Sequence, residues 1–81
     1  MNDDTVDAAI LRLAEARGPG KSICPSEAAR ELDPENWRSR LSAVREGAVR
    51  LALGGRVDIL RKGKAVDPTD FKGVYRIAIR A

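Results

Sequence analysis

The sequence contains no histidine and only one cysteine, Cys24, among its 81 residues. Without histidine, the chain lacks the commonest general base of enzymes and the commonest metal ligand of proteins. A single cysteine excludes a disulfide bond within the chain, so we expect a reducing, cytoplasmic environment. These absences argue against a self-sufficient catalytic site, and we expect no enzymatic activity, no cofactor and no bound metal.

Large apolar groups and long apolar runs are also scarce. The only aromatic residues are Trp37, Phe71 and Tyr75, and 33% of the chain is charged. No uncharged run approaches the roughly 20 residues that a membrane-spanning helix needs, and no apolar segment follows the acidic start. At 81 residues the chain is well below the length at which proteins divide into domains, so we expect one domain, residues 1–81, with no membrane partner.

Charge is divided unevenly along the chain, whose net charge is +3. Residues 1–35 carry four basic and eight acidic groups, whereas residues 36–81 carry eleven basic and four acidic groups. A cationic half on an otherwise acidic domain is the electrostatic feature expected for a polyanion partner. Abundant Arg and Ala are also what a GC-rich genome produces, so charge alone does not identify that partner.

The apolar spacing predicts a first helix that begins at Asp3 or Asp4, either of which can cap it. The tripeptide Gly18-Pro19-Gly20 ends this helix. Its buried face is predicted to contain Val6, Ala9, Ile10, Leu13 and Ala14, which recur at helical spacing.

A short extended segment at residues 22–24 is followed by the predicted second helix. Pro25 suits its first position, with Cys24 as the cap and Glu27 at the third helical position. Asp33-Pro34 ends it.

The third predicted helix is the longest, from Pro34 or Trp37 to Leu53, and Gly54-Gly55 closes it. Its basic residues are spread around the helix, and Arg50, opposite the core face, is expected to be exposed. One broad apolar face is predicted to contain Trp37, Leu41, Val44, Ala48, Leu51 and Ala52.

After Gly55 the apolar period changes to two, which predicts a β-hairpin. Val57 and Ile59 mark its first strand, and residues 61–64 read as a turn. Residues 65–73 form a loop before a last strand marked by alternating Tyr75, Ile77 and Ile79.

This order of elements predicts an α+β, mainly α, winged helix-turn-helix: three helices plus a two-stranded hairpin wing, with residues around Ile23 as a candidate short third strand. Another small α+β domain is the main alternative.

Several segments carry a resemblance to a known family. They are Gly18–Arg30, which includes an unbroken Ile-Cys-Pro-Ser-Glu stretch, and Asn36-Trp37-Arg38, Val44-Arg45, Gly55-Arg56-Val57, Lys62–Pro68 and Lys72–Arg76. Together they resemble a small bacterial family of uncharacterised proteins, domain of unknown function 3253. The resemblance covers most of the chain from Gly18 onward and implies a winged-helix fold. It implies no activity and supplies no catalytic residues.

The first turns of the third helix contain four candidate DNA contacts, Arg38, Ser39, Ser42 and Arg45. This part of a recognition helix commonly enters the major groove, where Arg pairs with guanine O6 and N7. Serine contacts a phosphate or a base edge. The alternative interpretation is a solvated helix face whose Arg stems cover apolar neighbours.

The hairpin turn contains two further candidates, Lys62 and Lys64, whose flexible ammonium groups suit phosphate contact. Asp67 and Asp70 in the following loop would oppose that contact. The alternative interpretation is a hairpin edge whose charges prevent aggregation.

Other patterns have simpler structural interpretations. Cys24 is expected to be a small buried group, and Trp37 and Tyr75 are expected to belong to the core. Residues 18–22 lack the spacing of a phosphate-binding loop.

The sequence therefore predicts a module that binds nucleic acid, most simply duplex DNA. The alternative is a winged-helix domain for protein interaction or homodimerisation, since fold alone does not settle its use. Val49, Leu53 and Leu60 are difficult to bury together, which favours an exposed apolar patch.

Overall fold

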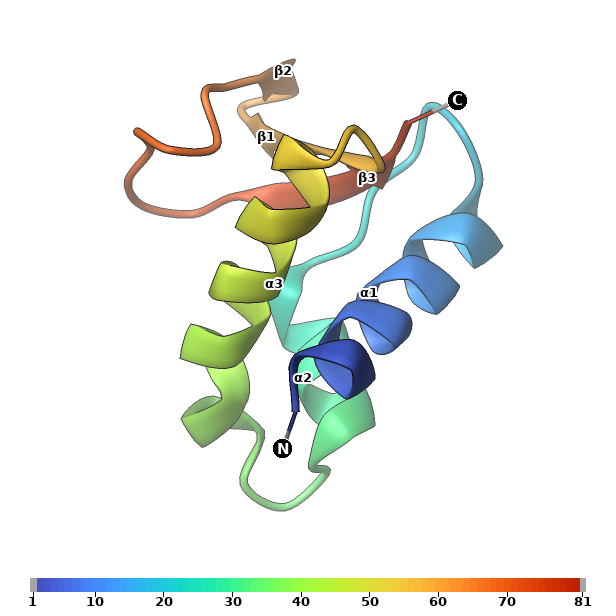
Figure 1. Cartoon of the computed structure of the whole chain (residues 1–81), viewed down its shortest axis with the longest axis vertical. Helices are drawn as coiled ribbons and strands as arrows, with labels where there is room; N and C mark the ends of the chain where they lie inside the picture. Colours follow the sequence, from blue (N-terminus) through green and yellow to red (C-terminus); the bar gives the residue numbers. More distant parts are fainter. Residues whose placement is uncertain (1, 81) are drawn as a thin grey trace.

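The computed structural model of the chain describes residues 2–80 and shows an α+β, mainly helical fold. Its helices and strands follow one another in the order of a winged helix, which confirms the predicted fold class. The elements are α1 (Asp3–Arg17), α2 (Pro25–Leu32), the 3₁₀ turn η1 (Trp37–Arg40), α3 (Leu41–Leu53), β1 (Val57–Arg61), β2 (Lys64–Ala65) and β3 (Arg76–Ile79). Figure 1 shows the sheet at one end of the three helices.

The sheet is antiparallel, with strand order β2-β1-β3. Val57 pairs with Ile79, and Ile59 pairs with Ile77, so the alternating apolar residues lie on one face. Ile23 makes an isolated antiparallel bridge to Ile77, which confirms the extended segment expected there.

The start of α1 differs from the prediction, because Asn2 rather than Asp3 or Asp4 caps the helix. The side-chain Oδ1 of Asn2 accepts a hydrogen bond from the backbone N–H of Thr5 at 2.8 Å. Asp3 and Asp4 occupy the first turn, where negative charge is favourable beside the helix dipole. The expected apolar stripe is confirmed, with Leu13 half-buried and the rest buried.

The start of α2 is as predicted. Pro25 is the first helical residue, and the carboxylate of Glu27 accepts a hydrogen bond from the backbone N–H of Cys24 at 2.7 Å. The same carboxylate pairs with Arg17 at 2.7 Å, which links the end of α1 to the start of α2.

The predicted third helix is divided into two parts. Trp37–Arg40 form a 3₁₀ turn, and the α-helix begins only at Leu41. Ser39 explains this difference, because its backbone N–H and its hydroxyl both donate to the carbonyl of Asn36, at 3.0 and 2.6 Å. A bond from residue i to i−3 defines the tighter turn, and a serine hydroxyl that competes for backbone carbonyls favours it.

The wing (residues 62–75) contains a strand that the sequence did not reveal. Lys64 and Ala65, expected in a turn and a loop, form β2 and pair with Arg61 and Leu60. Lys62 and Gly63 make the two-residue turn, with φ of 53° and 80°. Two positive φ values suit a tight hairpin, but Lys-Gly is a weaker signal for it than Asn-Gly. Residues 66–75, the wing loop, then lead to β3, which begins after Tyr75.

The α1 and α3 helices approach each other closely at Gly47. A Cβ atom at this position would lie 2.8 Å from Oδ1 of Asp7 and 2.9 Å from Cγ1 of Val6. Arg50, expected to be exposed, instead donates to Asp7 at 2.9 Å across the same contact. The prediction for Arg50 was wrong because the periodicity of α3 gives the direction of a side chain but not the position of the neighbouring helix α1, which carries Asp7.

Replacing Gly47 with Ala is expected to destabilise the fold by about 1–3 kcal/mol, because the added methyl group overpacks the contact between α1 and α3. The matched control is Gly54→Ala, where a Cβ atom would lie 3.5 Å from the nearest backbone oxygen and φ is −81°. Urea unfolding of both variants gives the comparison. A Gly47→Ala protein at least as stable as the native one would contradict the close approach, since helical Gly→Ala ordinarily gains roughly 0.5–1 kcal/mol.

Candidate functional site

The four helical candidates lie in η1 and the first turns of α3 but differ in their surroundings. Arg38 and Ser39 are exposed in η1, Ser42 is exposed in the first turn of α3, and Arg45 is half-buried one turn later. The guanidinium carbon of Arg38 lies 4.4 Å from the ring centroid of Trp37, a cation–π distance. Its donors form no ion pair within residues 2–80, so they are available to a partner.

Arg45 contacts the wing loop. Its Nη2 donates a hydrogen bond to the carbonyl oxygen of Phe71 at 2.7 Å, and its guanidinium carbon lies 4.0 Å from the Phe71 ring centroid. Phe71 in turn packs edge-on against Tyr75, with the two ring centroids 5.2 Å apart. The residue predicted to read bases therefore fastens the wing loop to α3.

A second arginine holds the same segment from the other side. Arg61 at the end of β1 donates from Nε to the carbonyl oxygen of Val74 at 2.9 Å. Its guanidinium lies against Gly73, where a Cβ atom would be 3.2 Å from Nη2, and Gly73 has a φ of 83°. Only glycine fits easily at this position, so the wing loop is fixed by contacts to both α3 and β1.

Five arginines of the described residues pair with carboxylates, Arg50 with both Asp7 and Asp3, and five of these six ion pairs use acidic residues of the first half of the chain. The shortest pair of each arginine is, in chain order, Arg12–Glu31 at 2.6 Å, Arg17–Glu27 at 2.7 Å, Arg40–Asp33 at 3.3 Å, Arg50–Asp7 at 2.9 Å and Arg80–Asp58 at 2.6 Å. In contrast, none of the cationic candidates Arg38, Arg45, Lys62 and Lys64 pairs with a carboxylate in the described part of the chain.

The wing also carries negative charge that its lysines do not neutralise. The side chain and backbone of Thr69 donate to Asp67 at 2.7 and 2.9 Å, and these hydrogen bonds lower the pKa of Asp67. Asp67 is therefore ionised at neutral pH and reduces the positive potential of the wing loop. The part of the wing that favours contact with a polyanion is residues 62–64, the wing turn, where Lys62 and Lys64 are exposed.

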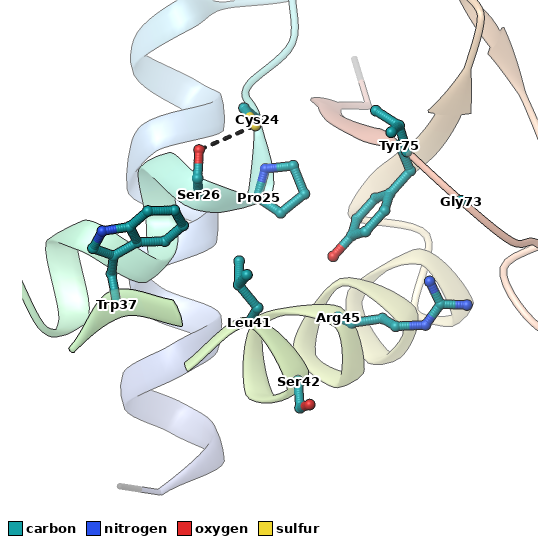
Figure 2. A pocket seen from close by; sticks show the side chains of 10 residues that line it. Cys24, Pro25, Ser26, Trp37, Leu41, Ser42, Arg45, Gly73 and Tyr75 are labelled. Carbon is teal, nitrogen blue, oxygen red and sulfur yellow. Dashed lines mark hydrogen bonds between the residues drawn. The ribbon is translucent and has the colours of Figure 1, made fainter. Parts of the chain in front are cut away.

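An open groove of about 530 Å³ lies between the start of α2, the start of α3 and the end of the wing loop (Figure 2). Ser42 and Arg45 line this groove together with Val74 and Tyr75. Lys62 lines an adjoining hollow that shares Val74 and Tyr75. Ser42 and Arg45 line the groove and Lys62 lines the adjoining hollow, so all three lie near Val74 and Tyr75. Arg38 contacts Trp37, which lines the groove. Lys64 lies on the edge strand β2.

Sequence reasoning missed this groove. Trp37 and Tyr75 were assigned to the core, and Tyr75 is indeed buried, whereas Trp37 is only half-buried and forms a groove wall. The groove is lined by residues 24–26, 37–45 and 73–75, three segments that are separated by 11 and 28 positions in the sequence. Helical and strand periodicity act over shorter ranges, so no local pattern reveals the groove.

A family model matches residues 3–80, and it is described as a protein of unknown function, DUF3253. The chain belongs to the DUF3253 family. The match includes the segments that carried the resemblance and extends it through α1. No curated protein matches the chain. The family description assigns no activity, so the functional argument for this DUF3253 domain depends on its geometry.

Two further properties limit the chemistry of the described residues. Within residues 2–80, none of the helices has both the length and the apolar character needed to cross a membrane. Nor do those residues bring together three or more His, Cys, Asp or Glu side chains that could hold a metal ion.

Replacing Arg45 with Met should loosen the wing loop while leaving the helices in place. The variant keeps an apolar stem but removes the charged donor to Phe71, which is worth about 1–2 kcal/mol. We expect that loss in urea unfolding and faster amide hydrogen exchange in residues 66–75. The matched control, Arg56→Met, removes an exposed guanidinium that forms no ion pair within residues 2–80. Equal exchange in the two variants would show that Arg45 does not hold the loop.

Burial raises the pKa of the Tyr75 phenol from 10.0 to about 12, although the nearby Arg45 charge partly opposes this shift. The neutral form is therefore favoured in the folded state. Its stabilising contribution is complete below pH 10 and is lost between pH 10 and about 12, where the unfolded chain ionises first. We expect this loss to be about 1–2 kcal/mol, given that each pKa unit is worth about 1.4 kcal/mol before solvent screening.

Tyr75 is the only tyrosine, so its tyrosinate absorbance reports this pKa directly. Comparing urea unfolding of the native chain with that of Tyr75→Phe separates the loss from Lys and Arg titration. An ordinary absorbance midpoint near pH 10 would contradict a buried phenol.

Proposed function

We propose that this DUF3253 domain binds duplex DNA through residues 38–45 and the wing turn. The observation that carries the proposal is the pattern of ion pairing. Acidic groups of the first half are paired with Arg12, Arg17, Arg40 and Arg50, while Arg38, Arg45, Lys62 and Lys64 have no carboxylate partner among residues 2–80. Cations that no carboxylate neutralises attract a polyanion.

The arrangement of elements supports the same function. In Figure 1 the wing loop, which connects β2 to β3, lies on the side of α3 away from α1, so the acidic first helix does not cover it. The start of α3 lies at the end of the molecule away from the sheet, so a bound duplex would have to contact both ends of its longest dimension. An α-helix such as α3 fits the major groove, which is about 12 Å wide. The longest dimension of the molecule is 31 Å, comparable with about nine base pairs at roughly 3.4 Å each.

The roles of the candidate residues differ within this proposal. Arg38 and Ser42 are the exposed groups at the start of the helix and are assigned to base edges and phosphates. Lys62 and Lys64 contact phosphates through the wing turn. Arg45 acts as a positioning residue, since its contact with Phe71 sets the place of the wing loop relative to the helix.

Fluorescence anisotropy with a labelled mixed-sequence duplex tests the proposal. At low salt we expect binding at tens of micromolar protein or below. The logarithm of the association constant should fall linearly with the logarithm of the salt concentration, with a slope of about −0.9 for each phosphate contact. The Lys62→Gln/Lys64→Gln double variant should bind more weakly and lose roughly 2 from that slope. Lys21→Gln is the matched control, because Lys21 is an exposed lysine in the connection between α1 and α2.

Two results would overturn DNA binding. One is the absence of any anisotropy change at tens of micromolar protein in low salt, where even non-specific binding is detectable. The other is a double variant that binds like Lys21→Gln, since charge would then act without regard to position.

A protein-interaction role is the second candidate, and exposed apolar side chains favour it. Leu53 is 65% exposed and Val74 is 83% exposed. The patch expected from Val49, Leu53 and Leu60 is smaller than predicted, because Val49 and Leu60 are half-buried. Sedimentation distinguishes the homodimer form of this role, which requires association at high protein concentration.

A further inference from the structure

The groove between α2, α3 and the wing loop has a chemistry that DNA contact does not explain. Its walls are mainly apolar, and its volume of about 530 Å³ is within the usual range for small-molecule sites. The apolar walls are formed by Pro25, Trp37, Leu41, Val74 and Tyr75. Contact with a phosphate backbone would not bury these apolar surfaces favourably, whereas an apolar ligand would remove them from water.

One polar group projects into the groove from a buried position. Tyr75 is only 8% exposed, and Figure 2 shows its hydroxyl directed into the groove between Leu41 and Arg45. None of the hydrogen bonds within residues 2–80 involves this hydroxyl. Among the described residues the enclosed side-chain polar atom without a partner is Nε of Arg40, so the Tyr75 hydroxyl is open to the groove and is free to donate to a ligand there.

The charge at the groove specifies what kind of acceptor fits. Arg45 uses Nη2 for the Phe71 carbonyl, and its Nε and Nη1 donors have no partner among the described residues. No carboxylate is among the residues that line the groove. A neutral phenol donor beside a guanidinium with two spare donors matches an anionic oxygen, and a carboxylate is the planar anion that arginine binds best.

We propose that this groove binds a small amphipathic carboxylate, with the carboxylate at Tyr75 and Arg45 and the apolar body against Trp37, Leu41 and Pro25. The inference does not depend on DNA binding, since it is tested without nucleic acid, although Ser42 and Arg45 belong both to the groove and to the proposed DNA surface. The wing loop forms one wall of the groove, so a ligand there would also contact the segment that Arg45 and Arg61 hold.

Trp37 provides a built-in reporter, because it is the only tryptophan and lines the groove. Titration with octanoate, which does not fluoresce, should change its emission saturably. Octanamide has the same chain without the charge and should bind at least about tenfold more weakly, since a charged hydrogen bond is roughly twice as strong as a neutral one. Acetate, which has the charge without the apolar body, should cause no saturable change.

Variants localise the binding. Tyr75→Phe removes only the hydroxyl and should weaken octanoate binding about fivefold to tenfold. Val74→Asp places a negative charge at the groove rim, on a side chain exposed enough to leave folding unaffected, and should weaken binding at least tenfold, roughly the effect of 1.4 kcal/mol. Leu53→Asp is the matched control, an equally drastic change at an exposed apolar residue outside the groove, and should bind like the native chain.

Three outcomes would overturn the carboxylate site. They are equal affinity for octanoate and octanamide, equal weakening by Val74→Asp and Leu53→Asp, and a linear, non-saturating change of Trp37 emission with octanoate. The first would indicate purely apolar binding, and the other two would indicate adsorption at no defined site. None of these outcomes bears on the anisotropy experiment with DNA.

Discussion

The contact between Arg45 and Phe71 determines how the second half of this domain is arranged. Most of the wing loop lies outside the sheet, and a buried backbone carbonyl requires a hydrogen-bond partner. Arg45 of α3 donates to the carbonyl of the buried residue Phe71 at 2.7 Å, and Arg61 of β1 donates to the carbonyl of the exposed residue Val74 at 2.9 Å. The first bond holds the wing loop to α3, and the second holds it to β1. Together they set the width of the groove.

The other side of α3 is fixed by packing against α1. Gly47 allows a separation that no larger residue permits, and the ion pair between Arg50 and Asp7 lies at the same contact. This pair belongs to a wider division of charge. Acidic groups of the first half neutralise arginines from both halves, while Arg38, Arg45, Lys62 and Lys64 are among the cations without a carboxylate partner in residues 2–80. The division supports DNA binding more strongly than the net charge of +3 does.

Local chemistry explains how much of this was predictable. The cap at Cys24, the proline at position 25 and the apolar stripe of α1 follow from rules that act within a few residues, and they were confirmed. The 3₁₀ turn at Trp37–Arg40 and the strand β2 were missed, because a serine side chain and a two-residue turn overrode weak local signals. The roles of Arg45 and Arg50 were not predictable. Their partners lie 26 and 43 positions away, and periodicity carries no information at that range.

The groove is the clearest case of information that appears only on folding. Trp37, Arg45 and Tyr75 meet because α3 and the wing loop are held together, whereas the sequence assigned Trp37 and Tyr75 to the core and Arg45 to DNA contact. DNA binding and ligand binding in the groove would both depend on the wing loop that Arg45 and Arg61 hold in place. The two proposals are tested with different ligands, so each can succeed or fail separately.

Backbone amide chemical-shift mapping by NMR, with unlabelled duplex DNA added at low salt, shows which residues contact the DNA. We expect the largest changes on residues 38–45 and 62–64, with the amides of α1 nearly unchanged. Changes concentrated in α1, or spread evenly over the described residues, would contradict a DNA-binding surface formed by α3 and the wing.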